Sequence, residues 1–528
     1  MSPRSRSSST TSDDLLLAIE DDPKHDPSPP ASWQNLPHKT ELMALAFCRF
    51  SEPLTQTSLL PFIYYLLQSF PTADGSPPSA STISKQAGVL QSSFAFAQCL
   101  TGFFWGWLSD HIGRKPVILM GIAGTIVSIL GFAFADNFQE ALFWKVLSGV
   151  LNGNVGVFRT VVGETVREKK HQARAFLIMP ICFNVGIVLG PMLGGALADP
   201  MGKYSGSPPL WGVHWPEWTE RYPYALPNVV NAVFLMGSWF AGLFLLQETL
   251  ETQRHKPDMG ARVLLFFRRL YRRVPTGHTK QPPSSSSSGT EEETERTPLL
   301  PSPSESPSFE PRPPFLSMFT PQILLTLLCF TFTPLHNATW MQLYSIFLSA
   351  PSASNPLLGG LNLSPVSVGT ALSFLGTLGI AMQLIVYPPV QIRLGLIRSY
   401  RWSNSLFPIA YLLTPMLVFL RRISDAATWA GISGVLAIQV AARTFAFPAS
   451  IALLTNAVEV PGVLGTIHGV GSSLMALSRT VGPLVGSWGL AKGMEGWGVE
   501  WVFWTLSLIA AASWTVSLRL KEGRGLGH

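Results

Sequence analysis

Charged residues are scarce in this chain. Asp, Glu, Lys and Arg make up 13% of its 528 residues, whereas soluble proteins carry about a quarter. Hydrophobic residues reach 47% and the mean hydropathy is positive, at +0.27. This composition excludes an ordinary soluble domain and favours a protein that crosses a membrane many times. The net charge of +6 does not form one basic stripe but gathers at the ends of apolar runs, so we expect no nucleic-acid partner.

Cysteine and histidine are also few. The four cysteines, Cys48, Cys99, Cys182 and Cys329, stand singly inside apolar segments without CxxC spacing, so we expect neither a disulfide framework nor a metal site. The chain also lacks HExxH, GxSxG and nucleotide-binding motifs. These absences argue against an enzyme, a bound cofactor and an ATP-driven pump.

Twelve apolar segments approach the roughly 20 residues that a helix needs to cross a bilayer. Six lie near residues 42–67, 87–108, 116–135, 141–163, 175–198 and 226–247, and six near 321–349, 366–388, 401–420, 428–454, 463–490 and 499–518. Backbone groups in lipid must be satisfied within their own segment, and strict alternation is missing, so we predict helices rather than a barrel. The predicted fold class is an all-α polytopic membrane protein.

Composition and repetition divide the chain into two halves. Residues 249–315 contain a polyserine run at 284–288 and an acidic patch at 291–295, which cannot build a core. The stretch GPMLGGALA from Gly190 is echoed by GPLVGSWGLA from Gly482, each in the fifth span of its half. We predict a disordered cytosolic tail (1–40), a six-helix bundle (41–248), a disordered cytosolic linker (249–315), a second, pseudo-symmetric six-helix bundle (316–520) and a short cytosolic tail (521–528).

Short-loop Lys and Arg predict the orientation. The loops on the amino-terminal side of the membrane hold more of them than the opposite loops, so both termini are expected in the cytosol. These cytosolic residues are Arg114, Lys115, Arg167, Lys169, Lys170, Arg174, Arg393, Arg398 and Arg401. Arg421 and Arg422, in an outer loop, are exceptions.

Two motifs resemble those of a known family. Residues 106–116, GWLSDHIGRKP, resemble the G-x-L-(A/S)-D-x-x-G-R-K-P signature between helices two and three of the major facilitator superfamily. Residues 186–195, GIVLGPMLGG, resemble a signature of its proton-coupled antiporters, and WGWLSDHIGRKP with RTVVGE is similar to the fungal and plant branch of zinc-induced-facilitator-like carriers. The resemblance implies the major facilitator fold, with two bundles around a cavity that opens alternately to either side.

We interpret the first motif as a gating latch between the halves. Asp110 can reach the positive amino end of a helix, which the resemblance places in span eleven, and Arg114 can pair with Glu164 at the end of span four. Gly106 allows close packing and Gly113 a tight turn. The predicted latch comprises Gly106, Asp110, Gly113, Arg114, Lys115, Glu164 and Arg159. The alternative is a positive-inside anchor with a helix turn.

Charges inside the spans predict a polar centre, because ionisable groups are costly in lipid. Arg49, Glu52 and Gln56 share one face of span one, and Glu52 is the only carboxylate well inside a span. It is either a proton site or half of a static ion pair with Arg49. The resemblance places Lys145 where many family members carry Arg, and Arg479 lies along span eleven. The candidate coupling and cavity residues are Glu52, Arg49, Gln56, Lys145, Asn152, Arg443 and Gln439.

Small residues mark the second motif. Gly186, Gly190 and Gly194 recur every four residues, and Pro191 and Gly195 stand beside them. The stripe predicts close approach of another helix. Such contact serves simple packing as well as the sealed half that an antiporter needs.

These features favour a secondary active transporter without enzymatic activity. We expect proton-coupled antiport of a small organic solute, for efflux or vacuolar sequestration, by a monomer whose partners are the solute, protons and the lipid bilayer. A non-transporting sensor or scaffold on the same fold, or a proton symporter or uniporter for a nutrient, are the alternatives. The segment ERTPLL, with Glu295, Leu299 and Leu300, resembles an acidic dileucine signal for cytosolic sorting adaptors and favours the vacuolar over the plasma membrane.

Overall fold

The computed structural model describes residues 38–72, 74–166, 169–202, 215–250, 253, 318–458 and 464–521. The side chains of Val155, Arg159, residues 169–180, Leu464 and Gly465 are outside this description. Most of both predicted tails, most of the predicted linker and the sorting signal at Glu295, Leu299 and Leu300 also lie outside the described residues.

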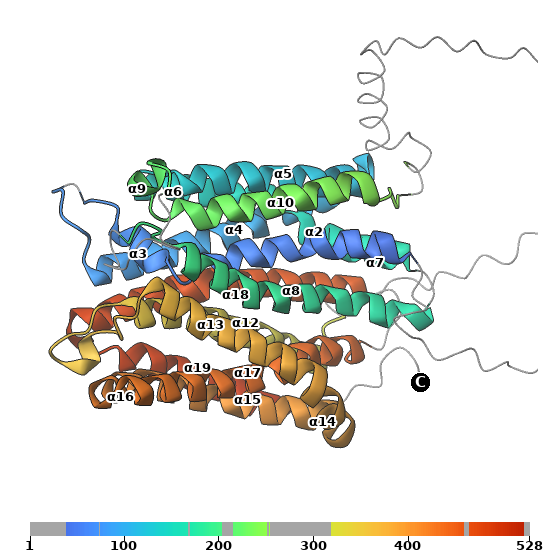
Figure 1. Cartoon of the computed structure of the whole chain (residues 1–528). Coiled ribbons are helices and arrows are strands. Elements are labelled where there is room, and N and C mark those ends of the chain that lie inside the picture. The colour runs from blue at the N-terminus through green and yellow to red at the C-terminus, as the bar shows by residue number, and fades with distance from the viewer. Residues whose placement is uncertain are drawn as a thin grey trace, which may run out of the picture.

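The described chain is helical and has no strand, and its long helices run side by side (Figure 1). The first half comprises α2 (Lys39–Ser58), α3 (Ile63–Gln68), α4 (Ala80–Ile112), α5 (Arg114–Ala133), α6 (Phe138–Leu151), α7 (Asn154–Thr165), α8 (Lys169–Leu197), α9 (Trp218–Arg221) and α10 (Ala225–Leu245). The second half comprises α12 (Pro321–Ser349), η4 (Pro356–Leu358), α13 (Pro365–Ala381), η5 (Met382–Val386), α14 (Tyr387–Leu394), α15 (Leu396–Leu413), η6 (Thr414–Met416), α16 (Leu417–Ile423), α17 (Asp425–Asn456), α18 (Leu464–Lys492), η7 (Gly493–Trp497) and α19 (Glu500–Ser517).

Each predicted span coincides with one helix or a run of consecutive helices. Within the described ranges, six helical segments are long and apolar enough to cross a membrane by composition alone. Polar residues lower the mean hydropathy of some of the other predicted spans, as Arg49 and Glu52 do in span one. Several helices begin at a capping side chain that accepts a backbone N–H, as Ser79, Thr320 and Ser424 do, which satisfies a donor that the first turn leaves open.

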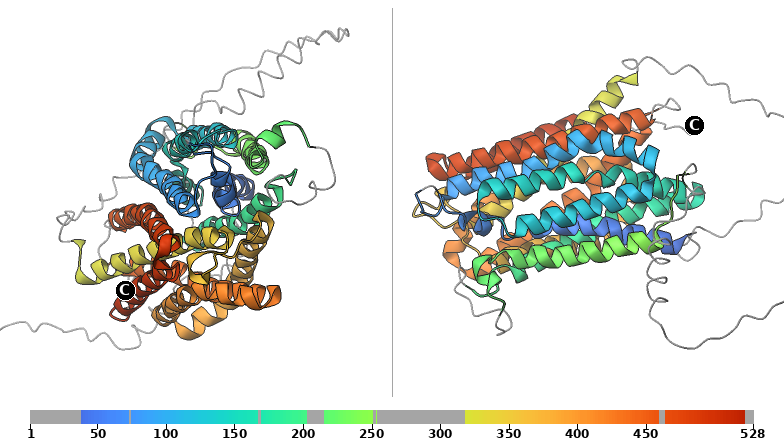
Figure 2. Two further views of the ribbon diagram at one scale, coloured as in Figure 1. Left: turned by 90° about the vertical axis from the view of Figure 1, so that its left-hand side faces the viewer. Right: turned by 90° about the horizontal axis from the view of Figure 1, so that it is seen from above.

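The helices form two bundles, one from each half of the chain (Figure 2). Across the boundary, α4 packs against α18 and α8 against α13. The contacts are close because they use glycine. A Cβ placed on Gly88 would stand 2.5 Å from the Ser487 Cβ, and one on Gly195 would stand 2.9 Å from the Gly369 Cα. The fold is therefore the predicted arrangement of twelve membrane helices in two six-helix halves.

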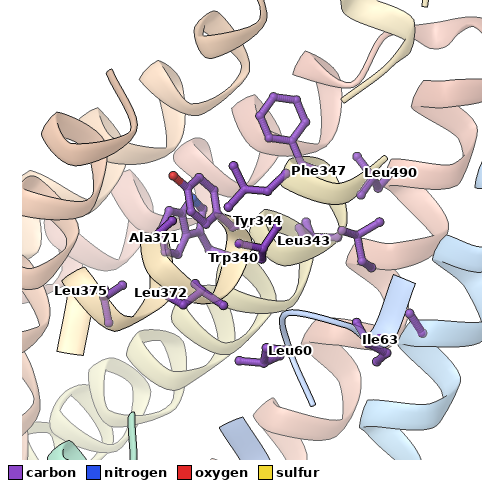
Figure 3. Close-up of a cluster of buried hydrophobic side chains, with 14 of the residues drawn as sticks. Leu60, Ile63, Trp340, Leu343, Tyr344, Phe347, Ala371, Leu372, Leu375 and Leu490 are labelled. Atoms are coloured by element: carbon purple, nitrogen blue, oxygen red, sulfur yellow. The ribbon is translucent and has the colours of Figure 1, made fainter. Parts of the chain in front are cut away.

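One end of the molecule carries Gly113 and the first residues of α2, and the positive-inside pattern makes it the predicted cytosolic end. The opposite, predicted outer end carries Ser79 and Lys492. At the outer end a single hydrophobic cluster joins the halves: Leu60 and Ile63 of the first lie near Trp340, Leu343 and Leu490 of the second (Figure 3). Two further clusters each belong to one half. The halves are thus packed together at the outer end.

The α4–α18 pair opens toward the predicted cytosolic end. Near the outer end the Ser84 hydroxyl donates to the Ser487 carbonyl at 2.8 Å. Farther along, a Cβ placed on Gly102 or Gly106 of α4, or on Gly469 of α18, would have no heavy atom within 4 Å in the described part of the chain. Among the described residues, α4 and α18 are therefore in contact toward the outer end and apart toward the predicted cytosolic end.

Candidate functional site

The turn between α4 and α5 is built around Gly113, whose φ of +109° suits glycine. The backbone N–H groups of Arg114 and Lys115 donate to the Glu248 carboxylate at 2.8 and 3.1 Å. A carboxylate at this position satisfies open donors and complements the positive end of the helix. Glu248 follows α10 and was not predicted as a site residue. The only sequence signal was an acid at the end of span six, on the side of the membrane where the loop was expected.

Arg114 connects three elements at the predicted cytosolic end. Its side chain is 8% exposed, pairs with Asp110 and donates to Glu164 at 3.1 Å. Thr249 donates to the other Glu164 oxygen at 2.5 Å. The expected Arg114–Glu164 contact is present, but every partner named here lies in the first half of the chain.

Some expectations for the predicted latch differ from the structure. The expected close packing of Gly106 is wrong in this state, because the space around it is open. Lys115, predicted to hold the loop in the cytosol, is 2% exposed and is buried within the first bundle. Asp110 pairs with Arg114 in its own half. Residues 459–463, which precede α18 and its predicted contact with Asp110, lie outside the described residues, as does the Arg159 side chain. The latch role of these residues stays a prediction.

The polar centre begins on α2. Arg49 and Glu52 form an ion pair, with side chains 13% and 16% exposed, and Gln56 is half-buried one turn later. Arg479, in the middle of α18, lies within electrostatic range of Glu52 and Arg49 of α2 and of Cys99 of α4. Arg479 and Cys99 are both exposed. These side chains bring α2, α4 and α18, and so both halves, to one site.

The second half adds a polar pair. The Gln439 side chain of α17 is 1% exposed and donates to Asn337 of α12 at 2.8 Å. Arg443, one turn further and half-buried, lies on the same face of α17. Within the described ranges, no cluster of His, Cys, Asp and Glu could hold a metal ion.

Lys145 lies apart from Glu52. Its Nζ stands 5.5 Å from the ring centroid of Phe94 and 5.8 Å from that of Phe132. Aromatic faces attract a cation, so the two rings stabilise the Lys145 ammonium inside the bundle. Among the residues that the structure describes, Lys145 forms no ion pair.

Span four is interrupted, and its prediction as one continuous helix is wrong. The chain leaves helical geometry at Asn152 and Gly153, between α6 and α7. Side chains of α4 take up nearby carbonyls: Trp105 Nε1 donates to Val150 at 2.7 Å and Gln98 Nε2 to Asn152 at 3.2 Å. A break inside a membrane helix requires such replacement partners. Asn152 is 3% exposed and forms part of this break.

The second glycine motif faces two helices. Cβ atoms placed on Gly186 and Gly190 would meet Pro53 at 2.8 Å and the Leu54 carbonyl at 2.8 Å, and one on Gly194 would overlap Ser58. On the other side, one on Gly195 would stand 2.6 Å from the Pro365 carbonyl, and Pro191 is buried. The motif therefore holds α8 against α2 in its own half and against α13 in the other.

A charged contact at the outer end was not anticipated. Lys85 of α4 and Lys492 of α18 each bind Glu495, at 2.8 Å. Hydrogen bonds from Lys492 and Lys85 lower the pKa of Glu495 to about 2. Lys85 is not among the predicted site residues, but its pair with Glu495 joins the two halves beside the hydrophobic cluster.

Helices in two bundles, charged groups held midway between them and contacts that close only one end define an integral membrane transporter. The Major Facilitator Superfamily model matches residues 45–347. The chain belongs to the Major Facilitator Superfamily, as its motifs predicted.

Its relatives agree with the expected branch. A multidrug transporter of this superfamily, mfsB of Aspergillus fumigatus, is 31% identical over 93% of this chain and 84% of its own. The Arabidopsis thaliana Protein ZINC INDUCED FACILITATOR 1 is 27% identical over 82% and 80%. The crystal structure of the human organic anion transporter MFSD10 shares the fold, with a TM-score of 0.56 and 19% identity over 91% of this chain and 99% of that one.

Proposed function

We propose that this protein is a proton-coupled secondary transporter that moves a small organic solute by alternating access. The observation that carries the proposal is Glu52, a mid-helix carboxylate that pairs with Arg49 and lies within electrostatic range of Arg479 of the other half. A carboxylate that changes partners as the halves move can bind a proton on one side of the membrane and release it on the other.

The direction of coupling has two candidates. Antiport, with efflux or vacuolar sequestration of the solute, is supported by the Gly186–Gly195 motif and by a multidrug transporter among the relatives. Symport is supported by the arginines around Glu52, because they would attract a negatively charged solute. A negative charge beside the Glu52 carboxyl favours its protonated form, so the solute and a proton would bind together.

The test is solute flux in proteoliposomes under imposed pH gradients, with internal pH recorded at the same time. We expect Glu52→Gln to remove the dependence of flux on the pH gradient, while the matched Glu41→Gln, near the start of α2, retains it. A static Arg49–Glu52 pair would instead give a less stable Glu52→Gln protein whose remaining flux still follows the gradient. Opposite movements of solute and proton identify antiport, and movements in one direction identify symport. No wild-type flux across a broad solute panel would favour a sensor or scaffold.

The network at Arg114 is proposed as the cytosolic latch of the same cycle. The open faces at Gly106 and Gly469 leave room for α4 and α18 to close, with Asp110 meeting the start of α18. We expect Asp110→Lys to slow transport and shift the population toward the cytosol-open state, measured by distances between spin labels. Unchanged transport and distances would contradict the latch.

We also propose the vacuolar membrane as the location. The supporting feature is the Glu295–Leu300 segment, which lies in the predicted cytosolic linker. Replacing Leu299 and Leu300 by Ala should redirect a fluorescently tagged protein to the plasma membrane. Unaltered placement would remove the sorting argument.

A further inference from the structure

Basic groups outnumber carboxylates in the middle of the described helices. Glu52 is the only carboxylate there that stands more than three residues from a helix end. The second half has four acidic residues between 316 and 520, namely Asp425, Glu459, Glu495 and Glu500. The described three begin α17, lie in η7 and begin α19, while Glu459 is outside the described residues. That half thus brings Arg443 and Arg479, but no described carboxylate, to the middle of the bundle.

The charged groups lie at one depth. Glu52 is 13 residues from the predicted cytosolic end of α2, Arg443 is 13 from that end of α17, and Arg479 is 15 from that end of α18. At about 1.5 Å per residue these separations correspond to about 20 Å. Arg479 also lies within electrostatic range of Glu52, in agreement with this common level.

Two of the basic groups have no hydrogen-bonded or ion-paired partner in the described chain. Arg49 is paired with Glu52, and Lys145 lies over two aromatic rings. In the ranges that the structure covers, neither Arg443 nor Arg479 forms a hydrogen bond or an ion pair with another residue. A guanidinium does not lose its proton in proteins, and charge in the middle of a membrane is costly. A negative group that enters from the open cytosolic end would be strongly favoured beside them.

We propose that the transported solute carries a carboxylate or phosphate group, and that Arg479 binds this group with support from Arg443. The inference rests on the proposed transport function and adds the chemical class of the solute. The planar guanidinium fork suits both groups because it can donate two parallel hydrogen bonds. The site disfavours organic cations, since its one carboxylate is already paired.

Cys99 provides a reporter that needs no knowledge of the solute. It is exposed, while Cys48, Cys182 and Cys329 are buried, and it lies within electrostatic range of Arg479. Its rate of modification is measured with an anionic and with a cationic methanethiosulfonate reagent, with Cys99→Ser as the blank. The rate with the anionic reagent is divided by the rate with the cationic one, and this ratio is divided by the same ratio for free cysteine. We expect a ratio above one, lowered on the order of ten-fold in Arg479→Gln and nearly kept in Arg479→Lys. A ratio below one, or one unchanged in Arg479→Gln, would overturn the proposal.

Transport tests the same inference through the solute. Wild-type proteoliposomes are offered an equimolar mixture of small organic anions, cations and neutral compounds, and mass spectrometry identifies what enters. We expect carboxylates or phosphates to enter, Arg479→Gln to lose at least ten-fold of that uptake, and Arg479→Lys to keep part of it. Uptake of cations or neutral compounds alone would overturn the inference but leave the transport function standing. Absence of any uptake, beside a Cys99 ratio that matches expectation, would contradict the transport function instead.

Discussion

Arg114 shows how one side chain organises an end of this bundle. It is buried, yet it reaches Asp110 and Glu164 at once, and the backbone beside it is held by Glu248. The charges of a signature loop thus have partners from α4, α7 and the segment after α10. In this state the loop therefore holds together three elements of the first half.

Glu248→Gln tests how this loop is held. The change keeps the size of the side chain but removes the negative charge at the start of α5, so we expect a loss of about 1 kcal/mol in stability. Thermal unfolding in detergent measures it, with Glu217→Gln, in the outer segment before α9, as the matched control. Equal melting temperatures for the two variants and the wild type would show that the carboxylate does not hold the helix start.

Two glycines should respond in opposite ways to the same methyl group. Gly194→Ala drives a Cβ into Ser58, and overpacking of this kind costs about 1–3 kcal/mol. Gly106→Ala has open space around it, so its folding stability should stay near that of the wild type. Size-exclusion profiles of heated protein measure both. Equal losses would contradict the close α2–α8 contact.

At the scale of the helix, span four consists of two helices, α6 and α7, separated by a break. The part nearer the predicted cytosolic end, α7, carries Glu164 of the Arg114 network, and the part nearer the outer end, α6, carries Lys145. The break at Asn152 and Gly153 allows these parts to differ in direction. Hydrogen bonds from Trp105 and Gln98 keep that break stable inside the membrane.

Trp105→Phe tests the cost of leaving the break unsupported. Phe keeps an aromatic ring but cannot donate to the Val150 carbonyl, so a buried acceptor loses its partner at a cost of about 1–3 kcal/mol. We expect a lower melting temperature, with the exposed Trp107→Phe as a control that changes little. A Trp105→Phe protein as stable as the control would show that the carbonyl finds another donor.

The apolar pattern of the sequence predicted where the helices lie, but not the break within one of them or the contacts between them. Apolar runs placed all twelve spans because lipid requires a minimum length of helix. The break in span four was not predicted, since Asn152 was interpreted as a cavity residue within one apolar span. Glu248 and the Lys85–Glu495 pair escaped because they depend on neighbours distant in sequence. The position of Lys145 between Phe94 and Phe132 likewise depends on rotations of three helices, which spacing does not give.

At the scale of the whole molecule, the two halves are held together most extensively at the outer end. The cluster around Trp340, the Ser84–Ser487 hydrogen bond and the pair of Lys85 with Glu495 all lie there. In the proposed transport cycle, opening of the outer end separates these contacts while α4 and α18 approach at Gly106 and Gly469. The structure therefore corresponds to one of the two states that alternating access requires.

The outer charge pair has a defined pH dependence. The pKa of Glu495 falls from 4.5 to about 2 when the two lysines bind it, so its contribution to closure is complete above pH 4.5 and is lost as the pH falls toward 2. We expect this pair to give no pH response of the outer end between pH 5 and 8. Glu495→Gln should raise the outward-open population at neutral pH, seen as a longer outer distance between spin labels. A distance unchanged by that substitution would show that the hydrophobic cluster alone closes this end.

The central claim, that the halves alternate between two closures, is tested most directly by measuring both ends in one set of samples. Double electron–electron resonance would compare labels at Phe103 and Ser473, on the open cytosolic faces, with labels at Ser76 and Ser352, on the outer loops, in wild type and Glu495→Gln. The account predicts opposite changes: where the outer distance lengthens, the cytosolic distance shortens. Outer opening without cytosolic closure, or a single unchanging distance at each end, would contradict it.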